Sequence, residues 1–235
     1  MALEAFARGI ATAFAIISAL SGCTAASGER IREQVHQSIA ADASSAVEID
    51  NIAGSVQVEG WPRPLVDVQA TKYGYDAEEL RGVAIEVRRE GAGISIATRY
   101  ASGVHGGGVR YVVSVPEGAS LRVSNDAGTV DVDNVSGNLV VETQAGKITA
   151  DAGRVGANRS ISLRATTGAI SLTIAPGSDA TVDAASTVGN FSSDIPGVTK
   201  TRENIVGARG GGTIGNGSGR IHLETTTGAI ALRQR

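Results

Sequence analysis

The side chains best suited to chemistry gather between residues 131 and 151. Asp131 and Asp133 flank Val132, so both carboxylates would point to one side of a strand. If neighbouring strands stack, that face gains further polar residues: Glu142, Lys147, Thr149 and Asp151. A carboxylate acting as a base beside a cation is an arrangement that cleaves polysaccharides. A solvated strand face alternates in the same way, and this reading stays open beside the catalytic one.

Other signatures of catalysis or metal binding are missing from the sequence. The three histidines, His36, His105 and His222, have no metal-ligand spacing, and no G-x-S-x-G motif is present. The glycine-rich segment 207–219 lacks the Lys-Ser/Thr pair of a phosphate-binding loop. Aromatic residues, on which sugars stack, make up 3% of the chain. We therefore expect no metal, no cofactor and no enzymatic activity.

The single cysteine, Cys23, ends an N-terminal apolar segment. Residues 9–20 form an apolar run of twelve residues after Arg8, which is too short to span a bilayer but suits the core of a signal peptide. One cysteine excludes a disulfide within the chain. Core burial and strand pairing must then stabilise the fold.

Residues 20–23, Leu-Ser-Gly-Cys, resemble the lipobox of bacterial lipoprotein signal peptides. The resemblance implies cleavage before Cys23 and lipid attachment to its sulfur. It divides the chain into a signal peptide (1–22), a tether (23–28) and one β-repeat domain (29–235). In a Gram-negative cell, Thr24 in place of aspartate would permit transfer to the outer membrane. An ordinary secretory signal with an incidental cysteine is the alternative.

Charge limits the partners further. The net charge is −3 and the isoelectric point is about 5.7, which argues against a nucleic-acid partner. The expected partners are the membrane, through the lipid on Cys23, and a polysaccharide or protein of the envelope.

An internal repeat must position these residues. Counted from a glycine, aliphatic residues occupy positions −7, −5, +2 and +4, and nineteen of the twenty slots hold Val, Ile or Leu. The 42% hydrophobic content would give roughly eight by chance. The repeat glycines, predicted as structural turn residues, are Gly54, Gly128, Gly146, Gly168 and Gly228.

The spacing of the slots predicts a corner at each glycine. Positions −5 and +2 are an odd number of residues apart, so a straight strand would place the two aliphatic pairs on opposite faces. Asn and Thr before the glycine can bond to nearby backbone, and glycine accepts a positive φ. Successive glycines 18 and 22 residues apart (128, 146, 168) suit coils of a β-solenoid. A sandwich of hairpins is the competing arrangement.

The N-terminal half predicts further elements. The composition of residues 29–43 allows a helix, but no clean helical stripe of apolar residues emerges, and we favour an extended edge segment. Residues 76–81 read as one helical turn behind Asp76. Residues 83–87 and 94–96 read as antiparallel strands of a hairpin.

The repeat weakens near the C-terminus. Around Gly189, Ala184 and Ser193 replace two of the aliphatic residues. Residues 194–202 and 207–219 read as surface loops, which are places where a functional surface is common.

Four segments together resemble the bacterial putative-adhesin family, a group of unknown function with glycine-turn β-repeats. They are VEIDNIAGSVQVEGW, YVVSVPEGASLRVSNDAGTVDVDNVSGNLVVETQAGKITA, SISLRATTGAISL and RIHLETTTGAIAL, within residues 47–235. The resemblance implies an all-β, right-handed β-solenoid-like domain displayed on the cell envelope. It supplies no catalytic residues.

The sequence thus favours a lipid-anchored, non-enzymatic binding, adhesion or structural module. Two alternatives remain: an enzyme that cleaves envelope polysaccharide through the Asp131–Asp151 face, and an envelope-stress sensor that acts through a protein partner.

Overall fold

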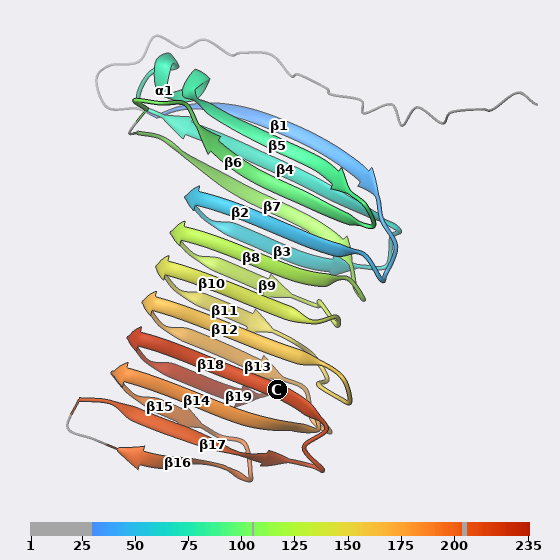
Figure 1. The fold of residues 1–235 in the computed structure, drawn as a ribbon, viewed down its shortest axis with the longest axis vertical. Coiled ribbons are helices and arrows are strands. Elements are labelled where there is room, and N and C mark those ends of the chain that lie inside the picture. Colours follow the sequence, from blue (N-terminus) through green and yellow to red (C-terminus); the bar gives the residue numbers. More distant parts are fainter. Residues whose placement is uncertain (1–29, 105, 204–205) are drawn as a thin grey trace, which may run out of the picture.

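The computed structural model describes residues 30–104, 106–203 and 206–235. The predicted signal peptide and tether, with Cys23, and also His105, lie outside the described residues. Within them the chain folds into two β-sheets that extend along the long axis of the molecule (Figure 1).

Sheet A has nine strands and sheet B has ten, and both mix parallel and antiparallel pairs. In spatial order, sheet A consists of β1 (Ile31–Ala40), β4 (Leu65–Gly74), β7 (Gly108–Pro116), β3 (Val56–Trp61), β9 (Val130–Asp133), β11 (Ile148–Asp151), β13 (Ile170–Ile174), β19 (Ile230–Gln234) and β15 (Phe191–Ser193). Sheet B consists of β16 (Val198–Glu203), β17 (Ala208–Ile214), β14 (Ala180–Val188), β18 (Gly219–Thr227), β12 (Ser160–Thr167), β10 (Leu139–Ala145), β8 (Ser120–Ala127), β2 (Ala46–Ala53), β6 (Gly93–Tyr100) and β5 (Val83–Glu90).

Each repeat unit gives one strand to each sheet and changes sheet at its glycine. The strand before the glycine lies in sheet B and the strand after it in sheet A, as in β10 and β11 around Gly146. Equivalent strands pair in parallel and in register, so Leu139 lies beside Leu121 and Ile161. Hairpins would pair antiparallel, so the parallel pairing excludes a sandwich of hairpins for the repeats.

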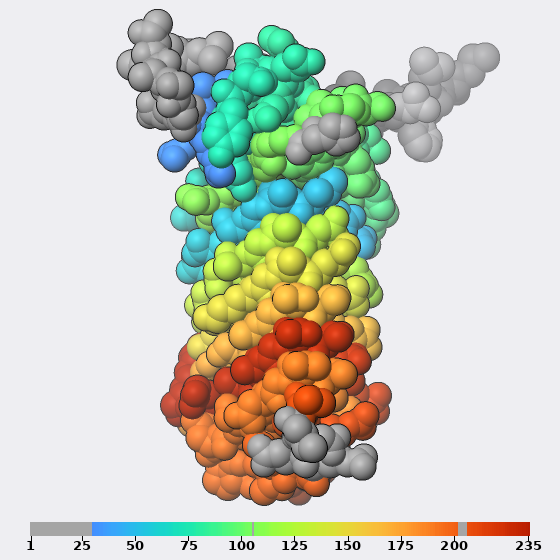
Figure 2. Space-filling model, turned by 90° about the vertical axis from the view of Figure 1, so that its left-hand side faces the viewer, coloured from blue at the N-terminus to red at the C-terminus, as the bar shows by residue number. Residues whose placement is uncertain are grey.

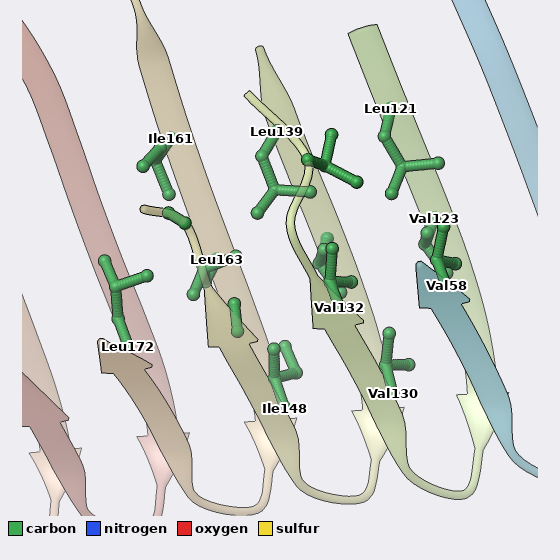
Figure 3. Close-up of a cluster of buried hydrophobic side chains, with 14 of the residues drawn as sticks. Val58, Leu121, Val123, Val130, Val132, Leu139, Ile148, Ile161, Leu163 and Leu172 are labelled. Atoms are coloured by element: carbon green, nitrogen blue, oxygen red, sulfur yellow. The ribbon is translucent and has the colours of Figure 1, made fainter. Parts of the chain in front are cut away.

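The aliphatic residues of the repeat fill the space between the sheets. Side chains from both sheets interdigitate in this core (Figure 3). The four slots around Gly168 (Ile161, Leu163, Ile170 and Leu172) are at most 1% exposed. The odd spacing between the aliphatic pairs therefore does produce a bend that turns both pairs inward.

The N-terminal end is built from antiparallel strands, as the sequence predicts. β1 pairs with β4, β4 with β7, and β5 with β6. β1 forms one edge of sheet A, which confirms the extended edge segment. The predicted helical turn is α1 (Ala77–Gly82), and the Asp76 side chain accepts hydrogen bonds from the first-turn amides of Glu78 and Glu79.

The C-terminal end differs from expectation in two ways. The segments predicted as surface loops, 194–202 and 207–219, contribute β16 and β17, which pair with each other antiparallel. The sequence missed this hairpin because three consecutive glycines, residues 210–212, interrupt the apolar alternation of β17. The second difference is that the weakened unit around Gly189 keeps its corner: Ala184 and Phe191 are buried, and the two strands join the ends of the parallel stacks.

The stack does not follow chain order at this end. β18 and β19, the last strands in sequence, lie between the unit of β12 and β13 and the unit of β14 and β15. Figure 2 shows this order as a red band above the orange residues that precede it in the chain. Among the described residues, no helix is long and apolar enough to cross a membrane.

Candidate functional site

The repeat glycines lie in register along the line where the chain passes from sheet B to sheet A. Their φ angles run from +123° at Gly54 to +155° at Gly146. A Cβ on Gly146 would lie 1.8 Å from the carbonyl oxygen of Gly128, and one on Gly168 would lie 1.7 Å from that of Gly146. Glycine is thus required both by its φ and by the close approach of the neighbouring unit.

A row of side chains lies beneath these corners, three residues before each glycine, and it is polar at every corner except that of Gly168, where Ala165 takes the place. Asn125 donates to the carbonyl of Gly54 (3.2 Å), Thr225 to that of Gly168 (3.1 Å) and Ser186 to that of Gly228 (2.8 Å). Each bond joins one unit to the unit before it in the stack. Thr143 has the same position, yet its hydroxyl is the one buried side-chain polar atom without a partner in the described part of the chain.

At the N-terminal end this row becomes a buried network. Asn51 donates to the Asn125 side chain (3.0 Å) and accepts from Thr98 (2.9 Å). Thr98 also shares a hydrogen bond of 2.8 Å with the hydroxyl of Tyr111. Burial raises the pKa of Tyr111 to about 12, so this phenol stays protonated and serves the structure.

The predicted acidic face is only partly assembled. Asp131 and Thr149 are neighbours on the outer face of sheet A, as are Asp133 and Asp151. Glu142 lies on β10 in sheet B, so its expected place on this face is wrong. The chain passes from sheet B to sheet A at Gly146, between Glu142 and Thr149. The alternation of polar residues along the sequence does not show that these two residues end on different sheets.

The electrostatics of this face are those of crowded carboxylates. Partial burial raises the pKa of Asp133, and the neighbouring charges of Asp151, Asp131 and Glu59 raise it further. Asp151 is held by the C-terminal Arg235 through contacts of 2.6 and 2.7 Å. In the described ranges, no group of three His, Cys, Asp or Glu residues could hold a metal ion.

Sheet B carries an open groove across its strands, named here the mid-stack groove. Its volume is about 440 Å³. One wall contains Glu142, Arg164 and Glu224, which are paired neighbours on three adjacent strands. The other wall includes Asp126 and Gln144. Arg164 forms ion pairs with both glutamates (3.4 and 3.3 Å), and Gln144 donates to Asp126 (2.8 Å). The groove therefore offers side chains that already bind one another.

Two histidines lie within the described residues, and both contact carboxylates. His36 on β1 lies 2.8 Å from Asp67. His222 points outward from β18, as expected, and lies 3.2 Å from Asp183 and 3.4 Å from Glu224. Contacts between partly exposed side chains such as these contribute little to stability.

A second hollow, of about 640 Å³, lies on sheet A beside the first two glycine corners. We name it the N-terminal hollow. Its lining contains three arginines and no carboxylate: Arg30, Arg32 and Arg110. The sequence analysis missed it, because these arginines come from two strands 78 positions apart in the chain (residues 32 and 110) that sheet A brings to either side of β4.

Arg159 is another residue that the sequence analysis missed. Its side chain is buried, and its guanidinium donates to the backbone carbonyls of four residues: Val135, Gly137, Ala152 and Arg154. Burial lowers its pKa. It ties together the two loops that leave β9 and β11, which is a structural role.

Comparison with known proteins identifies related sequences and folds. The family described as Toastrack DUF4097 matches residues 114–233. No curated protein matches the chain.

The fold is shared with a solved structure of a putative cell adhesion protein from Clostridium sporogenes, with a TM-score of 0.65, 12% identity, and coverage of 87% of this chain and 100% of that one. A putative adhesin from Parabacteroides merdae covers 89% of this chain and 97% of its own, with 11% identity and a TM-score of 0.29. A putative adhesin from Bacteroides fragilis gives 11% identity and the same TM-score, with coverage of 85% and 97%.

Proposed function

The chain belongs to the Toastrack DUF4097 family, and from this premise we propose that it is a non-enzymatic binding or adhesion module of the bacterial cell envelope. In this proposal the lipid on Cys23 anchors the protein to a membrane, the outer one in a Gram-negative cell. The domain extends from residue 29 to residue 235, and its coils wind in the right-handed sense.

The observation that carries the proposal is the regular outer surface of the two sheets. Parallel pairing in register brings equivalent outward residues of successive units side by side, as with Gln57 and Asp131 or Asp131 and Thr149. Neighbouring strands lie about 4.8 Å apart, so the surface offers polar groups at a short constant interval. A long, regular face of this kind suits an extended partner such as a polymer.

The name of the Clostridium sporogenes protein supports an adhesive role, because the two folds overlap along most of this chain. The mid-stack groove and the N-terminal hollow also support binding, since each is open and lies on the face of a sheet.

An envelope polysaccharide-cleaving enzyme is the second candidate, favoured by the placement of Asp131 beside Thr149 and of Asp133 beside Asp151 on one face. Against it, Glu142 lies on the other sheet and Asp151 is already paired with Arg235. Replacing Asp131 and Asp133 together separates the candidates. Loss of turnover in a folded protein supports the enzyme, and unchanged behaviour supports the binding module.

The test of the proposed function uses residues 24–235, which include every described strand. The protein is incubated with peptidoglycan, lipopolysaccharide and a panel of acidic and neutral polysaccharides. Two quantities are measured: retention on each polymer and release of new reducing or unsaturated ends. Retention without cleavage is the expected result, and cleavage would overturn the proposal.

The anchor has its own test. Cells that express the full chain are labelled with a fatty acid, and the parent protein should carry the label while Cys23→Ser should lose it. A C23S variant that keeps the label would contradict lipid attachment at this residue.

A further inference from the structure

We propose that the N-terminal hollow binds the phosphate of anionic lipid headgroups in the membrane that carries the anchor. This inference rests on the proposed function, since it gives the anchored module a second contact with its membrane. The hollow is defined by Arg30, Arg32 and Arg110 with the hydroxyl residues Ser55, Thr71 and Thr129.

Strand register brings these residues together. Thr71 on β4 lies between Gln34 of β1 and Arg110 of β7, and Tyr73 lies between Arg32 of β1 and Gly108 of β7. Alternate residues of a strand share a face, so Thr71 and Tyr73 point to the outer side with both arginines.

Gly54 and Gly128 line the hollow, and the Tyr73 ring packs closely against glycine backbone beside it. A Cβ on Gly108 would lie 2.6 Å from the hydroxyl of Tyr73, and one on Gly54 would lie 3.0 Å from the same atom. The Tyr73 ring thus lies over Gly108 and reaches the first corner. The guanidinium of Arg30 lies 5.2 Å from the centre of that ring, a cation–π distance.

Two of the three arginines of the hollow, Arg32 and Arg110, have no acidic partner among the described residues, whereas Arg30 interacts electrostatically with Glu79. Neither Arg32 nor Arg110 has an ion pair or a side-chain hydrogen bond among the described residues, and both side chains are exposed. Arg30 is hydrogen-bonded to the neutral hydroxyl of Tyr75. In the mid-stack groove, by contrast, Arg164 is bound by two glutamates.

Arginine suits phosphate because its planar guanidinium can donate two parallel hydrogen bonds to one group. The hydroxyls of Ser55, Thr71 and Thr129 add neutral donors beside it. A volume of about 640 Å³ has room for a headgroup.

The place of the hollow in the chain selects lipid phosphate as the source. Arg30 lies seven positions after Cys23, and a fully extended chain of that length spans at most about 25 Å. A lipid on Cys23 would therefore hold the hollow close to the bilayer surface. Outside the hollow, the outer face of sheet A is acidic at Asp131, Asp133 and Asp151, and an anionic surface would repel it. The stack should then stand with its N-terminal end on the membrane.

Cosedimentation with vesicles tests the inference. The protein is residues 24–235, without lipid, and the vesicles contain phosphatidylcholine alone or phosphatidylcholine and phosphatidylglycerol in equal parts. We expect binding to the second kind alone, weakened by salt. Arg32→Gln with Arg110→Gln should weaken it about 25-fold, since each cation near an anionic surface contributes roughly fivefold.

The matched control is Arg122→Gln with Arg220→Gln. These arginines are also exposed and have no side-chain partner among the described residues, but they lie on β8 and β18 of sheet B. The control removes the same charge and should bind nearly as well as the parent. An equal loss of vesicle binding in both double variants would mean that net charge alone explains the effect, and it would overturn the assignment to the hollow. The assignment would also fail if the parent protein did not bind the anionic vesicles. Thermal unfolding of each variant verifies that it folds.

Inorganic phosphate distinguishes the two sources of the ligand. If phosphate shifts the arginine side-chain NMR signals while anionic vesicles do not bind, the hollow serves a soluble phosphate and the membrane assignment fails. If the protein does not bind anionic vesicles but is retained on an uncharged polysaccharide, the lipid-phosphate inference fails and the proposed binding function stands. If the protein binds neither vesicles nor any polymer, the inference and the proposed function both fail.

Discussion

The parallel stack and the N-terminal end of the molecule reach stability by different routes. In the stack, each unit repeats the same aliphatic residues and the same glycine corner, and neighbouring backbones approach as closely as glycine allows. At the N-terminal end, antiparallel strands and a helical turn depend on individual side chains, among them the network of Asn51, Thr98 and Tyr111. The difference teaches that uniform backbone geometry specifies the stack, whereas individual side-chain contacts specify the N-terminal end.

The largest expected effect is at a stack corner. Gly146→Val should lower the free energy of unfolding by more than about 4 kcal/mol, because the new Cβ meets the Gly128 carbonyl and φ is positive. Urea denaturation measures it. The control is Gly156→Val, whose Cβ would have no atom within 4 Å and which should change stability by less than about 0.5 kcal/mol. Equal effects of the two substitutions would refute the role of corner packing.

Removal of the buried arginine should come next. Arg159→Met takes a donor from four loop carbonyls, so we expect a loss of about 3 kcal/mol in the same measurement. Arg154→Met, at an exposed position of the same loop, is the control and should be nearly neutral. A stable R159M variant would mean that the loops hold their places without this side chain.

Two smaller effects concern buried hydroxyl groups, one that is hydrogen-bonded at the N-terminal end and one without a partner in the stack. Tyr111→Phe removes a hydroxyl bonded to Thr98 and should cost about 1 kcal/mol. Thr143→Val removes the hydroxyl without a partner and should be neutral or stabilising by up to about 1 kcal/mol. Thermal unfolding of both variants compares them, and a greater loss for T143V than for Y111F would contradict the hydrogen-bond assignment.

The smallest effects are pH-dependent and opposite in sign. Burial opposes ionisation of Asp67, but hydrogen bonds from Ser38, His36 and Gln69 outweigh it and lower its pKa. Its contribution is therefore present above the unfolded-state pKa and lost as the pH falls through the folded one. For Asp133 the folded-state pKa is raised, so the protonated form is favoured and stability falls as the pH rises through that pKa.

At pH 7, Asp67→Asn should thus destabilise the protein and Asp133→Asn should stabilise it, each by about 0.5 kcal/mol because solvent screens both groups. Denaturation across the acidic pH range measures the two differences. Both should shrink once the carboxyl groups of the parent are protonated. Shifts of the same sign would disprove the contrast between the two sites.

Much of the fold follows from local pattern. The spacing of Leu139 and Val141 with Ile148 gave strands, an inward face and a corner at Gly146, since strand side chains alternate and only glycine tolerates this backbone. The edge strand β1, the Asp76 cap and the hairpin of β5 and β6 were likewise predictable. The glycine-rich β17 was not, because its pairing with β14 and β16 supplies the order that its side chains do not.

The sequence by itself determined the repeat, the buried aliphatic faces and the bend at each glycine, because these depend on residues within one unit. The tertiary structure decided which units become neighbours. It placed β18 between β12 and β14, put Glu142 and Asp151 on different sheets, and gathered Arg32 and Arg110 in one hollow. Such contacts join residues far apart in the chain, and they form when whole strands pair in register.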